Sequence, residues 1–184
     1  VLNNLNRAAE LIQSFKQVAV DQSNLDKRSF AVKTYIQDTL ISLKPHLKKT
    51  PHQITVNGDE QIEINSYPGA FSQIMTNLVM NSLRHAYPKG EAGNLHFELK
   101  WDSERLMIEY SDDGCGIPPE NREKIFEPFF TTARAQGGTG LGLHIVFNLV
   151  TQKLNGTIRC ESLKGQGTTF FIEIPNEFTV ISYQ

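Results

Sequence analysis

Two glycine-rich stretches decide the fold of this chain: residues 112–118, DDGCGIP, and residues 137–143, GGTGLGL. In the first, a carboxylate precedes a turn so tight that glycine adopts it far more easily than other residues. The second leads into an apolar helical run, an arrangement that turns helix N-terminal amides toward a phosphate. No G-x-x-x-x-G-K-[ST] occurs, and Leu143 stands where the third Rossmann glycine would be. The two stretches indicate a nucleotide site of a different kind.

A helix predicted upstream carries two asparagines, Asn77 and Asn81, four residues apart and therefore on one face. Arg84 and His85 follow on the same side at the next turn. An amide oxygen is a neutral, hard ligand that suits Mg²⁺, which keeps several waters and takes few protein ligands. Alone, two asparagines on a helix surface need no functional explanation. Beside the glycine-rich stretches, they indicate a binding face.

Five motifs follow one another along the chain in a fixed order: an asparagine helix (77–87), Asp-x-Gly-x-Gly (112–116), F-x-P-F (126–129), a glycine box (138–142) and Gly-Thr-Thr-Phe (167–170). In this order they resemble the ATP-binding domain of the GHKL superfamily, and within it the sensor histidine kinases. The resemblance covers roughly residues 28–175.

The resemblance implies an α+β fold: an α/β sandwich of one mixed, mostly antiparallel sheet with helices on one face (the Bergerat ATP-binding fold), preceded by one long helix. It divides the chain into the second helix of a truncated dimerisation and phosphoacceptor hairpin (1–22), a linker (23–28), the ATP-binding catalytic domain (29–175) and a C-terminal tail (176–184). Apolar spacings of three and four in residues 1–22 also allow a core-facing helix of the same domain.

Hydrophobic patterns and turn residues predict the elements inside this domain. The predicted strands are 30–32, 54–56, 62–64, 94–101, 105–110, 157–161 and 168–174, with 57–59 as a hairpin turn. The predicted helices are 33–49, 70–86 and 140–154, the last ended by Asn155-Gly156. Residues 119–139 are predicted to form a long irregular loop, which in a compact domain is usually functional.

By resemblance, Asp112 accepts a hydrogen bond from the exocyclic amine of adenine. Guanine has a carbonyl at that position, which the Asp112 carboxylate would repel. Asn81 coordinates Mg²⁺, and Asn77 lies beside the phosphates, so these two are the predicted catalytic residues. The full set predicted to bind the nucleotide is Asn77, Asn81, Arg84, His85, Tyr87, Asp112, Gly114, Gly116, Ile117, Thr131, Arg134, Gly138, Thr139, Gly140, Leu141, Gly142 and Leu143.

The identity of residue 77 separates two activities within the superfamily. The ATPase members carry a glutamate there as general base, and the amide of Asn77 cannot take a proton at neutral pH. The resemblance therefore implies transfer of the ATP γ-phosphoryl group to a histidine on a dimerisation domain, and onward to a response-regulator receiver domain. The alternatives are a GHKL ATPase, a protein kinase of the anti-sigma type, and a non-catalytic nucleotide-sensing domain.

One segment, His46-Leu47-Lys48-Lys49-Thr50-Pro51, nearly matches the acceptor pattern His-Glu/Asp-x-x-Asn/Thr-Pro of histidine kinases. Leu47 replaces the acidic residue that would orient the imidazole, and the segment lies inside the ATP-binding domain. We therefore expect the acceptor histidine to lie outside this chain, so that the chain does not phosphorylate itself in isolation.

The composition limits the remaining possibilities. A net charge of −2 gives no electrostatic case for nucleic acid. The two cysteines form no C-x-x-C pair, which favours a reducing setting. We expect a cytoplasmic domain, homodimeric in an intact protein that can carry a membrane anchor upstream.

Overall fold

The computed structural model describes residues 26–47, 50–88, 90–102, 104–133 and 138–175. The helix predicted over residues 1–22, most of the linker and the tail lie outside the described residues. None of the helices in the described part has the length and apolar character that crossing a bilayer requires.

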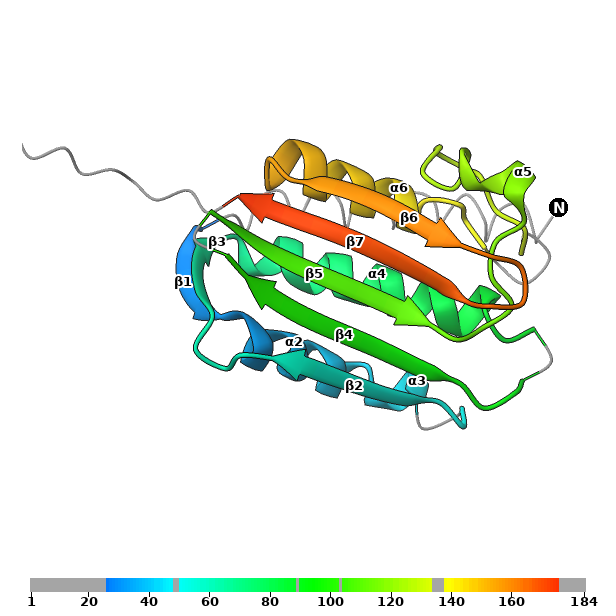
Figure 1. Ribbon diagram of the computed structural model, residues 1–184, viewed down its shortest axis with the longest axis horizontal. Coiled ribbons are helices and arrows are strands. Elements are labelled where there is room, and N and C mark those ends of the chain that lie inside the picture. Colours follow the sequence, from blue (N-terminus) through cyan, green and yellow to red (C-terminus); the bar gives the residue numbers. More distant parts are fainter. Residues whose placement is uncertain (1–25, 48–49, 89, 103, 134–137, 176–184) are drawn as a thin grey trace, which may run out of the picture.

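A five-stranded sheet forms one layer of the domain, in the order β2-β4-β5-β7-β6 (Figure 1). Its strands are β2 (Gln53–Gly58), β4 (Asn94–Trp101), β5 (Arg105–Asp112), β6 (Thr157–Ser162) and β7 (Thr168–Pro175). The β2–β4 pair is parallel, and the pairs β4–β5, β5–β7 and β6–β7 are antiparallel. The prediction of a mixed, mostly antiparallel sheet is confirmed.

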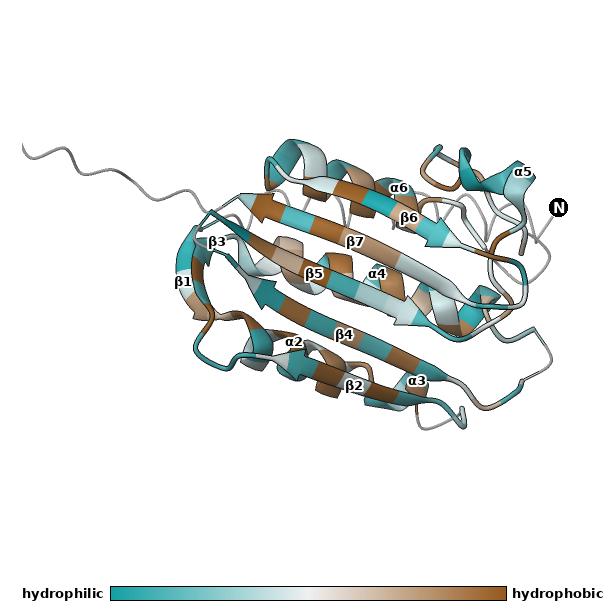
Figure 2. Cartoon of the chain, in the orientation of Figure 1, coloured by the Kyte–Doolittle hydropathy of each residue, from teal (hydrophilic) through white to brown (hydrophobic). Residues whose placement is uncertain are grey.

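Three helices form the second layer on one face of this sheet (Figure 1): α2 (Val32–Ser42), α4 (Pro68–His85) and α6 (Gly142–Asn148), the last continued by a π-helical turn η2 (Leu149–Lys153). Both α2 and α6 pack against the central α4. Figure 2 shows apolar and polar residues alternating along β4, β5 and β7. Because successive strand residues point to opposite faces, one apolar row per strand meets the helices. Phe97, Ile108 and Phe170 belong to these rows and are each at most 1% exposed.

The predicted hairpin between residues 54–56 and 62–64 is wrong. The second strand, β3 (Glu63–Ser66), pairs with β1 (Arg28–Ala31) in a separate two-stranded sheet. Gly58 remains in register with Leu99 as the last residue of β2. A Cβ on Gly58 would lie 2.7 Å from the Leu99 carbonyl oxygen, so this glycine permits close strand approach rather than forming the hairpin turn.

Two predicted helices differ in detail from those observed. The first stops at Ser42 and is followed by the short α3 (Lys44–Leu47), because Pro45 has no N–H for the helical ladder. The last begins at Gly142 and ends as predicted, with Asn155 in the left-handed region at φ 52°. A further short helix, α5 (Pro119–Arg122), occupies the start of the loop predicted to be irregular.

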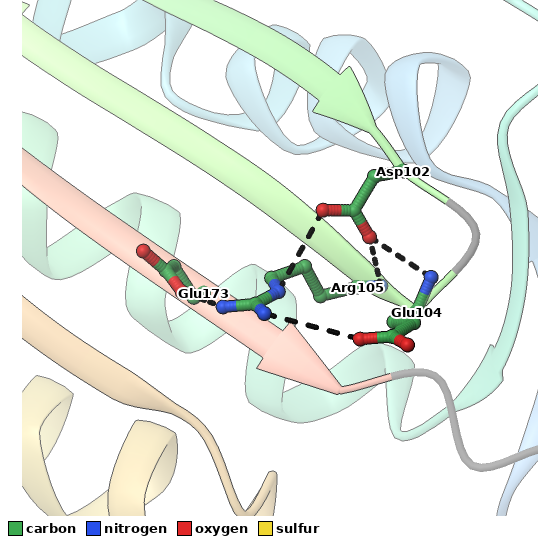
Figure 3. A network of polar contacts seen from close by, with 4 residues as sticks. All are labelled: Asp102, Glu104, Arg105 and Glu173. Carbon is green, nitrogen blue, oxygen red and sulfur yellow. Dashed lines mark hydrogen bonds and ion pairs between the residues drawn. The ribbon is translucent and has the colours of Figure 1, made fainter.

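Arg105 ties the β4–β5 turn to β7 at the exposed end of the sheet (Figure 3). Its Nη1 lies 2.7 Å from Oε2 of Glu173, and its Nε lies 3.6 Å from Oδ2 of Asp102. Oδ1 of Asp102 accepts backbone N–H bonds from Glu104 and Arg105, which closes the turn between β4 and β5. These side chains are half exposed, so the ion pairs add little stability.

A substitution at Ile108 tests how much the packing of β5 contributes to stability. It is 1% exposed and stands between Leu99 and Ile172 on the neighbouring strands. We predict that Ile108→Ala lowers the free energy of unfolding by about 2–5 kcal/mol, since it removes apolar contact and leaves a cavity. Ile41→Ala, the same change at a residue that is 54% exposed, should stay within about 0.5 kcal/mol. Urea denaturation measures both, and equal losses would contradict this packing.

Candidate functional site

A pocket of about 810 Å³ lies between α4, the turn after β5, the segment after α5 and the start of α6. Most of the residues predicted to bind a nucleotide meet there. Those that line it are Asn77, Asn81, Arg84, His85, Gly116, Ile117, Thr131, Gly138, Thr139, Gly140, Leu141, Gly142 and Leu143. Segments more than sixty residues apart in sequence thus form one cavity, in which Arg84 supplies positive charge.

Helix α4 provides the polar wall. Pro68 opens it at its first turn, and its apolar residues, such as Leu78 and Val79, are fully buried. The helix therefore presents Asn77 and Asn81 to the pocket from its other side. Nδ2 of Asn77 is buried and has no hydrogen-bond partner among the described residues. A buried amide without a partner carries a desolvation cost that a bound ligand can remove.

The glycine box stands opposite these asparagines. A Cβ on Gly142 would lie 3.5 Å from Oδ1 of Asn77, so the start of α6 closely faces that amide. Gly140 has φ +71°, and its oxygen accepts the backbone N–H of Phe129 at 2.9 Å. This bond draws the end of the F-x-P-F segment onto the glycine box. The F-x-P-F segment and the glycine box are thereby joined through backbone atoms.

Asp112, at the end of β5, is 7% exposed and lies outside the pocket lining. Its Oδ2 accepts a hydrogen bond from Oγ of Ser82 at 2.7 Å, and its Oδ1 accepts one from the N–H of Gly114 at 3.1 Å. Burial raises the pKa of the Asp112 carboxyl, while the hydrogen bond from Ser82 and those from the Gly114 and Thr168 backbones lower it. The net direction is upward.

The β6–β7 turn docks on the turn that follows Asp112. The N–H of Gly165 donates to the oxygen of Cys115 at 2.7 Å, and the N–H of Ile117 donates to Oγ of Ser162 at 2.8 Å. This contact brings Lys164 and Cys115 to the pocket lining. The sequence did not single out Lys164, because no local pattern shows that two distant turns meet.

His85 links α4 to the segment after α5. Its Nδ1 lies 3.3 Å from Oγ1 of Thr132, and both residues line the pocket. Burial and then the charge of Arg84 lower the pKa of the His85 imidazole. His85 is therefore neutral at physiological pH and can accept or donate one hydrogen bond at each ring nitrogen.

The remaining predicted residues are not brought into the pocket. Tyr87 points away: its hydroxyl donates to Oδ1 of Asp113 at 2.8 Å, and its ring stacks on His52 at 4.3 Å. Gly114 lies against Ala86, and its backbone N–H donates to Oδ1 of Asp112. Arg134 lies outside the described residues. Tyr87 thus lies outside the pocket lining.

Sequence reasoning also missed several lining residues. Gln73 and Met80 lie on α4, and Gln73 could have been found by extending the asparagine face one turn back. Ile125 and Phe130, beside the F-x-P-F segment, add an apolar wall. Asn121 comes from the unexpected α5.

Comparison with known proteins agrees with this arrangement. Residues 67–177 match the family described as "Histidine kinase-, DNA gyrase B-, and HSP90-like ATPase". The chain belongs to this family. The match confirms the resemblance that the five motifs indicated, and with it that the chain contains an ATP-binding domain.

Relatives within this family are sensor kinases. The chain is 32% identical over 188 residues to the sensor kinase CckA of Brucella abortus (strain 2308). The aligned region covers 95% of this chain and 20% of CckA. It is 36% identical over 157 residues to the sensor histidine kinase AruS of Pseudomonas aeruginosa, covering 79% of this chain and 15% of AruS. The chain therefore spans a fifth or less of these relatives.

Solved structures share the fold. The catalytic domain of the histidine kinase ThkA superposes with a TM-score of 0.71 at 26% identity, covering 82% of this chain and 95% of that domain. ThkA in complex with the response regulator protein TrrA superposes with a TM-score of 0.73 at 23% identity. The superposition covers 95% of this chain and 49% of the chain in that complex. The sheet and helices described above are those of a histidine kinase catalytic domain.

Gly140 allows a direct test of how this family's pocket is closed. A Cβ there would press on the carbonyl oxygen of Phe129 at 2.7 Å, whereas a Cβ on Gly90, at a similar φ of +74°, would meet nothing within 4 Å. We predict that Gly140→Ala weakens ATP binding by about tenfold or more, since it separates the glycine box from Phe129. Gly90→Ala should show only the backbone cost of about 1–2 kcal/mol in stability. Calorimetric titration and thermal unfolding measure the two effects, and unchanged affinity in Gly140→Ala would refute this reading of the contact.

Proposed function

We propose that this chain is the ATP-binding catalytic portion of a two-component sensor histidine kinase. It transfers the γ-phosphoryl group of ATP to a histidine on a dimerisation domain. One observation carries the choice of reaction: the described residues that line the pocket include no aspartate or glutamate, and an amide stands at position 77. The site thus binds a nucleotide without offering a carboxylate base to water.

The missing base matters for hydrolysis more than for phosphoryl transfer to histidine. A water molecule needs a group that takes its proton or orients it, whereas a neutral imidazole attacks through a free lone pair. His85 also lines the pocket, but its Nδ1 already contacts Oγ1 of Thr132. The arrangement therefore favours transfer over ATP turnover.

The residues of the pocket act by positioning and by balancing charge. Arg84 and Lys164 supply positive charge, and the glycine box supplies backbone amides next to Asn77. The Asn81 amide oxygen fits Mg²⁺, which accepts one protein oxygen together with phosphate oxygens and water. When bound, this ion neutralises charge that develops on the transferred group. Asn77, with its unpartnered Nδ2, is placed to donate to a phosphate oxygen.

Partners follow from the same proposal. The acceptor histidine lies on the protein's own dimerisation domain, so the intact protein works as a homodimer. ThkA was solved with the response regulator protein TrrA, which supports a receiver domain as the next phosphate acceptor here. Because ATP is the substrate, the domain works in the cytoplasm. His46, on the exposed α3, lies outside the pocket lining and is not the acceptor.

Adenine selectivity tests the assignment of Asp112. We predict that the chain binds ATP much more tightly than GTP, and that Asp112→Asn weakens ATP binding about tenfold or more, since a charge-assisted hydrogen bond is lost. The matched control is Asp113→Asn. The Asp113 carboxylate accepts bonds from Asn94 and Tyr87 away from the pocket. Isothermal calorimetry with both nucleotides measures these affinities. Equal affinities for ATP and GTP would contradict the assignment of Asp112.

Phosphoryl transfer in trans tests the reaction itself. We predict that the isolated chain shows negligible autophosphorylation and slow ATP hydrolysis, yet phosphorylates an added dimerisation domain that carries the acceptor histidine. Asn81→Ala should reduce this transfer about a hundredfold or more, because the metal loses its protein ligand. Asn65→Ala, on the exposed side of β3 at the other end of the molecule, is the control and should leave transfer unchanged.

An acid-labile phosphate assay with mass-spectrometric site mapping reads out both activities. Stoichiometric label on His46 of the isolated chain would contradict its exclusion as acceptor. Rapid ATP turnover without any acceptor would instead favour the ATPase alternative. Nucleotide binding with neither activity would favour a nucleotide-sensing domain.

A further inference from the structure

A buried line of hydrogen bonds runs behind the pocket from β5 through α4 and back to Asp112. The hydroxyl of Tyr110 donates to Oγ of Ser82 at 2.9 Å, and Oγ of Ser82 donates to Oδ2 of Asp112 at 2.7 Å. Tyr110 is 0% exposed and Ser82 is 1% exposed. Ser82 directly follows Asn81, so adjacent residues of α4 serve the pocket and this line. Neither Ser82 nor Tyr110 is among the residues predicted to bind the nucleotide.

The order of protons in this line depends on the charge of Asp112. Tyrosine and serine each carry one hydroxyl proton, and an ionised carboxylate carries none. With Asp112 ionised, Tyr110 donates to Ser82 and Ser82 donates to Asp112, so both protons have acceptors. If Oδ2 were protonated, it would donate to Ser82, whose own proton would then lose this acceptor in a buried setting. The line therefore favours Asp112 as an acceptor.

Selectivity for adenine requires that acceptor character. An ionised carboxylate can accept from the adenine amine, whereas a protonated one offers a donor that a guanine carbonyl could satisfy. We infer that Ser82, supported by Tyr110, is a positioning residue that holds Asp112 as a hydrogen-bond acceptor facing the base and so sets the preference for adenine. This rests on the proposed role of Asp112 in ATP recognition.

The other titratable groups around Asp112 do not change charge near neutral pH. Asp113 follows it on the chain, and its hydrogen bonds lower the pKa of that carboxyl. Burial raises the pKa of Tyr87, Tyr110 and Cys115, and that of the Cys160 thiol on β6 to about 12. His85 also lines the pocket; burial and the charge of Arg84 lower the pKa of its imidazole, so its charge is lost before neutral pH is reached.

The test compares ATP affinity of the wild-type chain and of Ser82→Ala from about pH 8 down to the lowest pH at which both proteins remain folded. Removing the Ser82 donor raises the pKa of Asp112, so the variant should lose affinity at higher pH than the wild type as the pH falls. We expect the midpoint of this loss to move up by about one pH unit, so that the two affinities lie within about threefold at pH 8 and diverge as the pH falls. The titration of ATP itself cancels in the ratio of the two affinities.

Two further variants keep the inference falsifiable. Tyr110→Phe leaves the Ser82–Asp112 bond intact, so its midpoint should move in the same direction by less. Ser66→Ala removes a hydroxyl of similar burial at the opposite end of the molecule and should not move the midpoint. A merely structural role for Ser82 would lower affinity equally at every pH. That result, or superimposable profiles for Ser82→Ala, Tyr110→Phe and the wild type, would overturn the inference.

Failure of the underlying function gives a different pattern. If Asp112→Asn binds ATP as the wild type does, the role of Asp112 in recognition fails. If Asp112→Asn weakens binding while Ser82→Ala and Tyr110→Phe do not shift the profile, the function stands and the role of Ser82 falls. Relaxed discrimination against GTP in Ser82→Ala at acid pH, absent in Ser66→Ala, is the supporting outcome for selectivity.

Discussion

The packing of α4 against the sheet is the constraint on which the rest of the site depends. Leu78 and Val79 are fully buried, so the rotation of the helix about its axis is fixed by its apolar side. Successive helix residues are about 100° apart, and a shift by one residue would carry Asn77 and Asn81 out of the pocket. The same rotation points Ser82 toward β5 and Asp112. One set of apolar contacts thus places the predicted metal ligand and the support of the predicted base-recognising carboxylate together.

Backbone contacts complete the pocket that α4 begins. Gly140 meets Phe129, and Gly116 meets the carbonyl of Leu163 in the β6–β7 turn, at distances that leave no room for a Cβ. The glycines of such motifs are commonly explained by the approach of phosphate, but here they also let protein segments approach each other. The shape of the pocket therefore depends on turns that are distant in sequence. This is also why Lys164 lines it without any motif of its own.

The sequence predicted the layers and most of the pocket because these depend on local periodicity and on motif order. The polar face of α4 followed from the spacing of Asn77 and Asn81, and the helix end at Asn155 followed from turn chemistry. The hairpin error had a physical cause: a glycine that permits close strand approach resembles a glycine that permits a turn, and Gly58 was of the first kind. The bond of Tyr87 to Asp113 could not be predicted, because it is known only once β5 and the end of α4 are placed side by side.

Burial of two polar groups, Asn77 and Asp112, carries a cost for the folded protein. Nδ2 of Asn77 is buried without a partner, and burial raises the pKa of the Asp112 carboxyl despite the donors that surround it. Each group would gain a hydrogen bond from the ligand proposed for it, a phosphate oxygen for Asn77 and the adenine amine for Asp112. A ligand that makes both bonds removes a penalty that folding had to overcome, so binding and folding stability are linked. In the proposed binding mode the two groups contact opposite ends of the nucleotide, so an adenine nucleotide with its phosphates would satisfy both, whereas either half alone would leave one unsatisfied. The penalties of the folded protein are in this sense part of its selectivity.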